Sequence, residues 1–397
     1  MKAPPRPENI ALSIGSAVLC RIVLNTARRF VYPFAPVFSR GLALPLTAVT
    51  SLIAAMQATS VLGVLSGPVA DRFGYRRMML AGMVMLIVGM GAAGFAATAV
   101  VVMPGLFLAA VGKSIYDPAI QAYVGERVPY HRRGLAIGLL ETAWAGSTLI
   151  AVPLISLLMN RYGWRSPFFA LGIAGFVGML AMARLIPGDA PKKVQTGFNG
   201  RAWLALLGQT VRHRPALGMV IYAFFMNMAN DNMFVVYGAW LESSFGIGIV
   251  ALGMGTGVIG LAESCGEGLT ALVADRLGLK RAVVIGLLMT ILSYTLIPLC
   301  GRDLTTALGG LFLLFLSFEF TIVTSMSLGT EVLPSARATM MSAFLAAAGL
   351  GRVCGALMGG PLWLAGGIAF IGAASAVGSV LALGALLWGL HRWRRGS

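Results

Sequence analysis

The sequence predicts an all-α membrane protein with twelve transmembrane helices, arranged as two pseudo-symmetric six-helix bundles. Three observations lead to this prediction: an apolar composition, a regular alternation of apolar runs with polar loops, and an internal repeat. Of the 397 residues, 58% are hydrophobic and only 11% are charged, and the mean hydropathy is +0.84. A soluble domain carries roughly 25% charged residues, so most of the surface of this protein cannot face water.

Apolar runs follow one another along the chain, and most are close to the ~20 residues that cross a bilayer as a helix. Those of the first half lie near residues 10–38, 46–66, 78–97, 100–124, 134–158 and 167–186. Those of the second half lie near residues 215–240, 247–270, 281–300, 304–328, 338–360 and 366–390. The predicted domains are an N-terminal bundle of residues 1–188, a cytoplasmic linker of residues 189–214, and a C-terminal bundle of residues 215–397. Within the linker, the amphipathic residues 203–211 are expected to lie along the membrane surface.

Basic residues are concentrated in alternate loops. One set of loops, taken together with the C-terminal tail, contains Arg72, Arg76, Arg77, Arg127, Arg132, Arg133, Lys192, Lys193, Arg201, Arg212, Arg214, Arg276, Lys280, Arg281, Arg337, Arg392, Arg394 and Arg395. The intervening loops contain Arg40, Arg161, Arg165 and Arg302. Lys and Arg collect in cytoplasmic loops, so both termini are predicted to be cytoplasmic, in a bacterial cytoplasmic (inner) membrane. The net charge of +16 is therefore interpreted as a topology signal, and a nucleic-acid partner is not expected.

The two halves share loop signatures at a nearly constant offset. The segment Gly67-Pro-Val-Ala-Asp71-Arg-Phe-Gly74-Tyr-Arg-Arg77 is echoed 204 positions later by Ala271-Leu-Val-Ala-Asp275-Arg-Leu-Gly278-Leu-Lys-Arg281. The segment Glu126-Arg-Val-Pro129 is echoed 205 positions later by Glu331-Val-Leu-Pro334. Two unrelated signatures with nearly one offset indicate two parallel six-helix halves. This architecture is typical of membrane transporters, with the solute site near the midplane of the bilayer.

At these residues the chain resembles the major facilitator superfamily of secondary transporters. The hallmark of that family, G-x-L-A-D-R-x-G-R-K/R, is matched from Gly67 to Arg77 apart from Val69 and Tyr75. The resemblance implies alternating access and a gating role for the motif, beside the simpler role of a turn whose charges fix the topology. The motif residues are Gly67, Asp71, Arg72, Gly74, Arg76, Arg77, Asp275, Arg276 and Gly278. In size and number of spans the chain is similar to bacterial drug/proton antiporters, which implies proton-coupled efflux.

Six ionisable residues are expected near the middle of the bilayer, counting about 1.5 Å per residue from each helix start. A charge at that depth costs ~2.5 kcal/mol or more, so it requires a partner or a water-filled cavity. These residues are Arg21, Lys113, Asp231, Glu263, Glu319 and Arg352. In the superfamily fold they all fall on spans that line or flank the central cavity, which predicts a polar translocation path. Three are basic and three are acidic, so the sign of the solute stays open.

The solute-binding residues are predicted from these charges and their neighbours. Arg21, Asn25 and Arg28 share one face of the first span through their i, i+4, i+7 spacing. Lys113 and Asp117, at i and i+4, form either a self-contained ion pair or part of the solute site. The full predicted set is Arg21, Asn25, Arg28, Lys113, Asp117, Asn227, Asp231 and Arg352.

Four carboxylates are candidates for proton coupling: Glu141, Glu263, Glu267 and Glu319. Glu263 and Glu267 lie at i and i+4, with no basic residue between them. Two carboxylates on one low-dielectric face favour proton uptake by one of them, which is the property that proton coupling requires. As an alternative, Arg352 pairs statically with Glu263 or Glu319.

The sequence predicts a transporter without enzymatic activity, cofactor or metal. Gly255-Thr-Gly257-Val-Ile-Gly260 fits G-x-G-x-x-G but follows no strand, so it is interpreted as helix packing. The leading function is proton-coupled export of a small amphiphilic organic solute by a monomer in a lipid bilayer. One alternative is uptake or exchange of an organic anion, with Arg21, Lys113 and Arg352 as counter-charges. A remoter alternative is a membrane scaffold or sensor that transports nothing.

Overall fold

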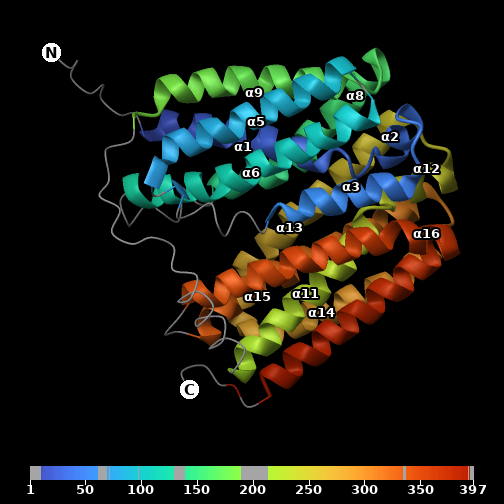
Figure 1. Cartoon of the computed structure of the whole chain (residues 1–397). Helices are drawn as coiled ribbons and strands as arrows, with labels where there is room; N and C mark the ends of the chain where they lie inside the picture. Colours follow the sequence, from blue (N-terminus) through green and yellow to red (C-terminus); the bar gives the residue numbers. More distant parts are fainter. Residues whose placement is uncertain are drawn as a thin grey trace. The chain divides into compact units, whose positions relative to one another are not determined.

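In a computed structural model of the chain, the described residues are 10–60, 69–70, 72–96, 98–128, 139–188, 213–333, 337–391 and 393. These residues form helices, with no strand among them (Figure 1). Nine described helices are long and apolar enough to cross a membrane, or ten if the bent pair α2 (Ala35–Gly41) and α3 (Leu46–Ala58) counts as one span. The predicted all-α membrane fold is confirmed, whereas the number of twelve spans stays a prediction.

Contacts along the backbone divide the chain into two compact units. Unit 1 comprises Met1–Val31, Arg40–Leu44 and Thr59–Phe198, and unit 2 comprises Tyr32–Ser39, Pro45–Ala58 and Asn199–Ser397. Unit 2 therefore includes two segments from the first half of the sequence, which the repeat did not indicate. The predicted linker, with its amphipathic residues 203–211, lies outside the described residues except for its last two positions. The predicted domain boundaries accordingly stay a prediction.

Unit 1 is built from helices that follow the predicted apolar runs. The first run, 10–38, is interrupted, because α1 ends at Arg29 and a turn containing Pro33 follows. Proline has no N–H to continue the ladder of helical hydrogen bonds. The span Leu139–Tyr162 includes a short π-helix, Ser147–Ala151, before α8. The labelled helices of the unit are α1 (Ile10–Arg29), α5 (Tyr75–Ala96), α6 (Ala99–Arg127), α8 (Val152–Tyr162) and α9 (Ser166–Leu185).

Paired glycines bring α5 and α6 together, backbone against backbone. A Cβ at Gly82 would lie 2.5 Å from the carbonyl oxygen of Gly112, and a Cβ at Gly112 would lie 2.5 Å from that of Gly82. Gly89 and Gly105 repeat this reciprocal arrangement further along the two helices. Small residues at such contacts let membrane helices approach closely and pack well, so this seam requires glycine at all four positions.

Unit 2 contains the remaining long helices. Its last helix, α16, is interrupted at Gly366 and Gly367, where φ is −158° and +59°. Since the second value lies in the left-handed region that favours glycine, α16 consists of two arms that match the predicted runs 338–360 and 366–390. The other helices of the unit are α3, α11 (Arg214–Phe234), α12 (Tyr237–Phe245), α13 (Ile249–Leu277), α14 (Leu279–Leu296) and α15 (Leu304–Val332).

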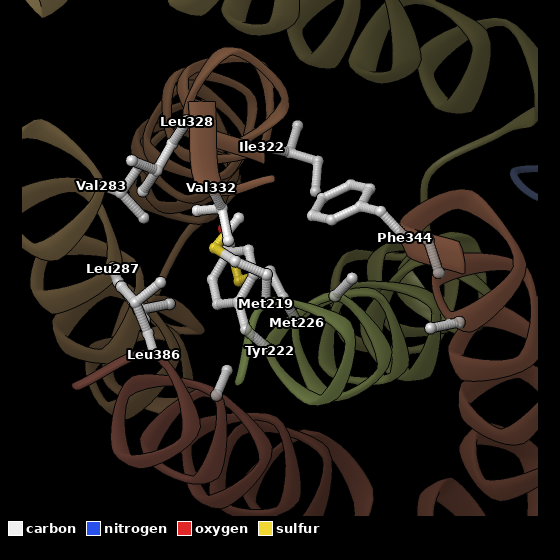
Figure 2. Packing of buried hydrophobic residues seen from close by; sticks show 14 of the residues in the cluster. Met219, Tyr222, Met226, Val283, Leu287, Ile322, Leu328, Val332, Phe344 and Leu386 are labelled. Atoms are coloured by element: carbon white, nitrogen blue, oxygen red, sulfur yellow. The ribbon is translucent and has the colours of Figure 1, made fainter. Parts of the chain in front are cut away.

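The apolar core of unit 2 is assembled around α11. Figure 2 shows Met219, Tyr222 and Met226 of α11 directed toward side chains of the surrounding helices. The surrounding side chains are Val283 and Leu287 of α14, Ile322, Leu328 and Val332 of α15, and Phe344 and Leu386 of α16. Because α11 is enclosed in this way, polar residues further along it must find partners inside the protein.

A row of glycines on α16 packs against the backbone of α11. Gly351, Gly355 and Gly359 are four residues apart, so they lie on one face of the helix. A Cβ at Gly355 would overlap the carbonyl oxygen of Met228 and lie 2.9 Å from the nitrogen of Asn232. A Cβ at Gly359 would lie 2.8 Å from the carbonyl oxygen of Asn232. The first arm of α16 is thereby held in one register along α11.

The repeated loop signature has the same local structure in each unit. Gly74 and Gly278, at equivalent positions of the repeat, have φ of +98° and +82°, and a helix begins directly after each of them. Two residues further on, Arg76 donates to the carbonyl of Ala183, near the end of α9. Its equivalent Lys280 donates to the carbonyl of Leu390, directly after α16. In each unit, a basic residue of the signature thus binds the carbonyl end of the last helix.

Replacing Lys280 with methionine is expected to lower the free energy of unfolding by about 1 kcal/mol. The Nζ of Lys280 lies 2.6 Å from the carbonyl oxygen of Leu390, and a cation at a helix C-terminus is favourable by about that amount. Chemical unfolding in detergent micelles would measure the change, with Lys280→Arg as the control that keeps the charge. Equal stability of the two variants would contradict this role.

Candidate functional site

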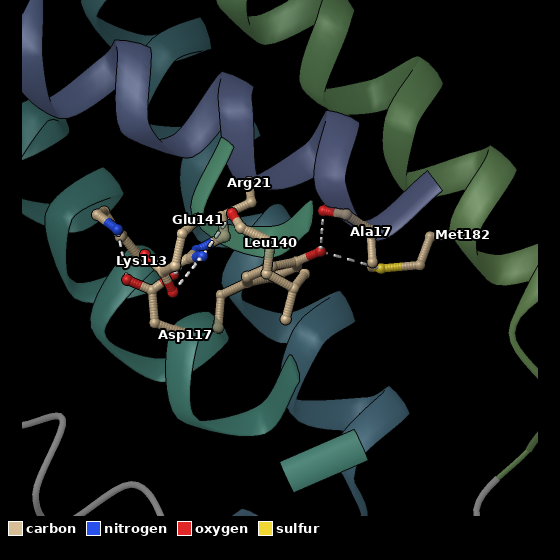
Figure 3. Close-up of polar contacts among 8 residues, drawn as sticks. Ala17, Arg21, Lys113, Asp117, Leu140, Glu141 and Met182 are labelled. Carbon is tan, nitrogen blue, oxygen red and sulfur yellow. Dashed lines mark hydrogen bonds and ion pairs between the residues drawn. The ribbon is translucent and has the colours of Figure 1, made fainter. Parts of the chain in front are cut away.

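Four charged side chains form a network inside unit 1 (Figure 3). Arg21 of α1 binds two carboxylates: its Nε lies 3.2 Å from Oδ1 of Asp117, and its Nη1 lies 3.0 Å from Oε1 of Glu141. Lys113 forms a further ion pair with Asp117, one turn along α6. The side chains of Arg21 and Lys113 are 6% and 3% exposed, whereas that of Glu141 is 47% exposed. The two cations are enclosed, and the carboxylate of Glu141 is accessible.

Two hydrogen bonds fix the helices around this network. The Nη1 of Arg21 donates to the carbonyl oxygen of Leu140 at 2.6 Å, which ties the guanidinium to the backbone of the helix that carries Glu141. The hydroxyl of Tyr116 donates to the carbonyl oxygen of Ala17 at 2.8 Å, one turn from Arg21 (Figure 3). The geometry of the ion pairs therefore depends on backbone contacts among three helices.

The indole of Trp144 and the amide of Asn25 lie beside the network. The guanidinium of Arg29 is 4.2 Å from the centroid of the Trp144 ring, and the ammonium of Lys113 is 5.9 Å from it, both within the range of cation–π attraction. Asn25 lies on α1 one turn from Arg29. It is fully buried, and neither its Nδ2 nor its Oδ1 bonds to any described residue. An unpaired buried polar group costs ~1–3 kcal/mol, so this amide is suited to a polar group of a solute or to water.

Asp231 is the centre of a second polar cluster, inside unit 2. Its side chain is 3% exposed. Its Oδ1 accepts from the hydroxyl of Tyr32 at 3.2 Å and from Nε2 of Gln57 at 3.1 Å, and Gln57 also donates to Tyr32. Its Oδ2 lies 3.8 Å from Nε of Arg352, which donates to Oδ1 of Asn227 at 3.1 Å. The two carboxylate oxygens thus serve different partners.

The spacing of polar residues on α11 explains why they divide between two roles. Asn227 and Asp231 are four residues apart and share the face that meets Arg352. Asn232 points elsewhere: its Nδ2 donates to Oγ of Ser375 at 2.9 Å and to the carbonyl oxygen of Ile371 at 3.3 Å. Both acceptors lie on the second arm of α16, so Asn232 joins helices, whereas the other two residues belong to the charged cluster.

Three of the four predicted proton-coupling carboxylates lie on α13 and α15. Glu263 and Glu319 are buried, at 4% and 9% exposure. Gly266 lies between Glu263 and Glu267 in sequence, and a Cβ there would lie 2.9 Å from the Cβ of Glu319. Glu319 therefore lies where α15 packs against α13, beside the turn of α13 that carries Glu267. Their role in proton coupling stays a prediction.

Comparison with known proteins identifies the family. The residue pattern of the Major Facilitator Superfamily matches residues 17–356, most of the chain. The chain belongs to the Major Facilitator Superfamily. Members of this superfamily are transporters, so the protein is an integral membrane transporter that moves a small molecule across a lipid bilayer, and it is not an enzyme.

Relatives within the superfamily include two uncharacterized MFS-type transporters of Bacillus subtilis (strain 168), YceJ and YwfA. YceJ is 24% identical over 300 residues, which are 75% of this chain and 75% of the relative. YwfA is 24% identical over 318 residues, which are 79% of this chain and 76% of the relative. A peptide transporter POT in complex with sulfate superposes with a TM-score of 0.80 at 13% identity, covering 96% of this chain and 95% of that one. An inward-facing bacterial homolog of the human lysosomal transporter Spinster gives 0.76 at 13% identity, with the same coverages. At such identities the solved structures show the superfamily fold alone.

The superfamily assignment confirms the resemblance based on the loop motif. Of the motif residues, Gly74 and Gly278 adopt the positive φ described above. Arg72, Arg77, Asp275 and Arg276 are exposed, and Gly67 and Asp71 lie outside the described residues. The gating role of the motif stays a prediction.

The structure decides two alternatives that the spacing left open. Lys113 and Asp117 form the expected ion pair, but this pair is not self-contained, because Asp117 also binds Arg21. The pairing of Arg352 with Glu263 or Glu319 is wrong: its ion pair is with Asp231. The physical reason is the glycine row, which brings α16 against α11 and places Arg352 opposite the polar face of that helix. Arg28 is partly exposed on α1, and its role in solute binding stays a prediction.

Sequence reasoning did not identify Tyr32 and Gln57 as members of a site. Gln57 is the single amide residue in the apolar run 46–66, and Tyr32 directly precedes Pro33. A lone amide in a membrane span requires a partner, so Gln57 could have been singled out. Its partner could not, because Asp231 is 174 positions away in the sequence.

Proposed function

We propose that this superfamily member exports a small amphiphilic organic solute by alternating access, in exchange for protons. In this proposal it works as a monomer in the bacterial cytoplasmic membrane, with both termini in the cytoplasm. The charged network of unit 1 and the carboxylates of α13 and α15 provide the groups that a proton-coupled transporter requires at membrane depth.

The observation that carries this proposal is the unequal burial of Arg21 and Glu141. The arginine is 6% exposed and the carboxylate 47% exposed, at 3.0 Å from each other. A buried guanidinium depends on its counter-charges. If Glu141 takes up a proton, Arg21 is left to share Asp117 with Lys113. A proton at an accessible carboxylate thus changes the charge of a buried network by one unit, which couples proton binding to solute binding at the same place.

The residues beside this network are suited to an amphiphilic solute. The ring of Trp144, which already attracts Arg29, is apolar and electron-rich, and the amide of Asn25 has an NH2 group and a carbonyl oxygen that bond to no described residue. Solute sites commonly combine an apolar lining with a few polar groups that fix orientation. A cationic group of the solute would compete with the proton for Glu141, and such competition produces exchange in opposite directions.

Uptake or exchange of an organic anion is the second candidate function. Its support is Arg352, whose side chain is 28% exposed and whose ion pair with Asp231, at 3.8 Å, is longer than those of Arg21. A guanidinium with a loosely held partner can bind an anionic group of a solute without losing a strong contact.

A pH-gradient assay in proteoliposomes tests the transport function. Purified protein would be supplied with a panel of cationic, zwitterionic and anionic amphiphiles, with and without an imposed gradient. Gradient-driven export of cations supports the leading function, and gradient-driven uptake of anions supports the second. Failure to move any solute or proton would support the remaining alternative, a scaffold or sensor, and would overturn both.

Replacing a coupling carboxylate with glutamine is expected to reduce gradient-driven transport about tenfold or more while solute exchange without a gradient persists. The variants are Glu141→Gln, Glu263→Gln and Glu319→Gln, each of which removes a proton site and keeps the shape of the side chain. Glu242→Gln, near the end of α12, is the matched control. If all three leave the pH dependence of transport unchanged, the proposed proton sites are wrong.

A further inference from the structure

Two segments of the first half of the sequence are bound by unit 2 next to the places where the chain changes units. The chain passes from unit 1 into unit 2 between Val31 and Tyr32, returns to unit 1 for Arg40–Leu44, and leaves unit 2 again between Ala58 and Thr59. We call the first and the last of these places the crossing points. Tyr32 lies directly at the first, and Gln57 lies one residue before the second. Both donate to the same oxygen, Oδ1 of Asp231.

We propose that Asp231 is a charge-dependent latch, which holds both crossing points to unit 2 while it is ionised and releases them when it is protonated. Asp231 acts here as a positioning residue, distinct from the proton sites named above. The inference rests on the proposed function for its purpose, since alternating access requires the two halves of a transporter to move. The latch itself rests on the contacts of Asp231.

The chemistry of a carboxylate supports such a latch. When ionised, it is an acceptor with two oxygens and can bind two neutral donors with one oxygen while the other faces a cation. In Asp231, Oδ1 accepts from the neutral donors Tyr32 and Gln57, and Oδ2 faces the cation Arg352. A proton would weaken the acceptor and end the attraction to Arg352, because hydrogen bonds to an ionised group are about twice as strong as neutral ones.

Titratable or charged groups from three other segments lie near Asp231: Tyr32 from the turn before α2, Arg352 from α16, and Tyr294 from α14. In a buried site, the ionised form of a carboxylate depends on a nearby cation. Arg352 therefore stabilises the ionised form of Asp231 and with it the closed latch.

The two segments also make contacts that do not depend on charge. The rings of Tyr32 and Phe234 lie 4.6 Å apart, and a Cβ at Gly238 would lie 2.8 Å from the carbonyl carbon of Pro33. A Cβ at Gly360 would lie 3.3 Å from the Cα of Thr47. These contacts keep the segments packed on α11, α12 and α16. Opening of the latch is therefore expected to loosen the segments without unfolding the unit.

Hydrogen–deuterium exchange of the full-length protein in lipid nanodiscs tests the latch. The readout is the protection of amides in residues 32–58, corrected for the pH dependence of intrinsic exchange. Protection should fall in wild type as the pH is lowered. Asp231→Asn should lower it about tenfold or more at high pH and abolish its pH dependence. Tyr32→Phe should lower it about fivefold or more, because the hydroxyl both donates to Asp231 and accepts from Gln57.

Arg352→Gln should shift the midpoint of the transition, because Asp231 loses the cation that faces its Oδ2. Tyr222→Phe is the control, since Tyr222 is buried on the same helix as Asp231 and lies about two and a half turns away. Unchanged protection in both Asp231→Asn and Tyr32→Phe would overturn the latch, as would an unmoved midpoint in Arg352→Gln. Hydrogen–deuterium exchange is measured without solute, so it reports on the latch alone. Transport is measured separately in proteoliposomes, so failure of the latch and failure of the transport function are distinguishable.

Discussion

Replacing Gly355 with alanine is expected to lower the free energy of unfolding by about 3 kcal/mol. The added methyl group would overlap the carbonyl oxygen of Met228 and lie 2.9 Å from the nitrogen of Asn232. Both contacts are to backbone, so no side-chain rotation relieves them. The two helices would have to separate, and overpacking of this kind costs about 1–3 kcal/mol where the structure cannot adjust. Unfolding in detergent micelles, followed by circular dichroism, would measure the loss.

The same substitution elsewhere on α16 provides the control. Gly384 is exposed, and a Cβ there would meet no described atom within 4 Å. Gly384→Ala is expected to be neutral or to stabilise the protein by up to about 1 kcal/mol, because alanine favours the helix. A result in which the two alanine variants are equally stable would contradict the close approach of α16 to α11.

The second large effect is expected for Asp117→Asn, which should lower the free energy of unfolding by about 3 kcal/mol. The substitution leaves Arg21 and Lys113, 6% and 3% exposed, without the carboxylate that lies between them. Removing one partner of a buried ion pair costs about 3–5 kcal/mol, because the remaining charge is uncompensated. The lower end applies here, since Asp117 is 25% exposed. Chemical unfolding of the purified variant would measure this change.

A second substitution distinguishes charge imbalance from lost packing. Lys113→Met in the Asp117→Asn background should recover at least half of the loss, because Arg21 retains Glu141 as its counter-charge. Asp303→Asn is the control for the same change at an exposed helix start. There the hydrogen bonds from the amide and hydroxyl of Thr306 hold the pKa of the carboxylate below its usual value, and asparagine can still accept from the amide. Strictly additive effects of Asp117→Asn and Lys113→Met would contradict a coupled network.

Much of the fold was predictable because a bilayer restricts the possibilities. Each apolar run must form a helix to satisfy its backbone, and the observed helices follow the predicted runs in order. The break after Arg29 had a signal in Pro33, and the interruption of α16 had one in Gly366-Gly367. The assignment of Tyr32–Ser39 and Pro45–Ala58 to unit 2 had none, because it follows from packing between residues far apart in the sequence.

The site was predictable in its members and not in its pairings. Spacing along one helix predicted the Lys113–Asp117 pair, because residues at i and i+4 are neighbours whatever the tertiary structure. The partners of Arg21 and Arg352 lie on other helices, and the choice among several buried carboxylates depended on helix packing. For Arg352, the glycine row on α16 selected Asp231 over Glu263 and Glu319.

The composition, the repeat and the loop motif were sufficient to determine an α-helical membrane transporter of the Major Facilitator Superfamily, because they record the solvent in which the chain folds and the duplication of its halves. Which charges pair with Arg21 and Arg352, and which segments Asp231 binds, was decided only by the packing of helices. A buried charge is stabilised by groups within a few ångströms, and for these residues those groups come from helices that are distant in the sequence.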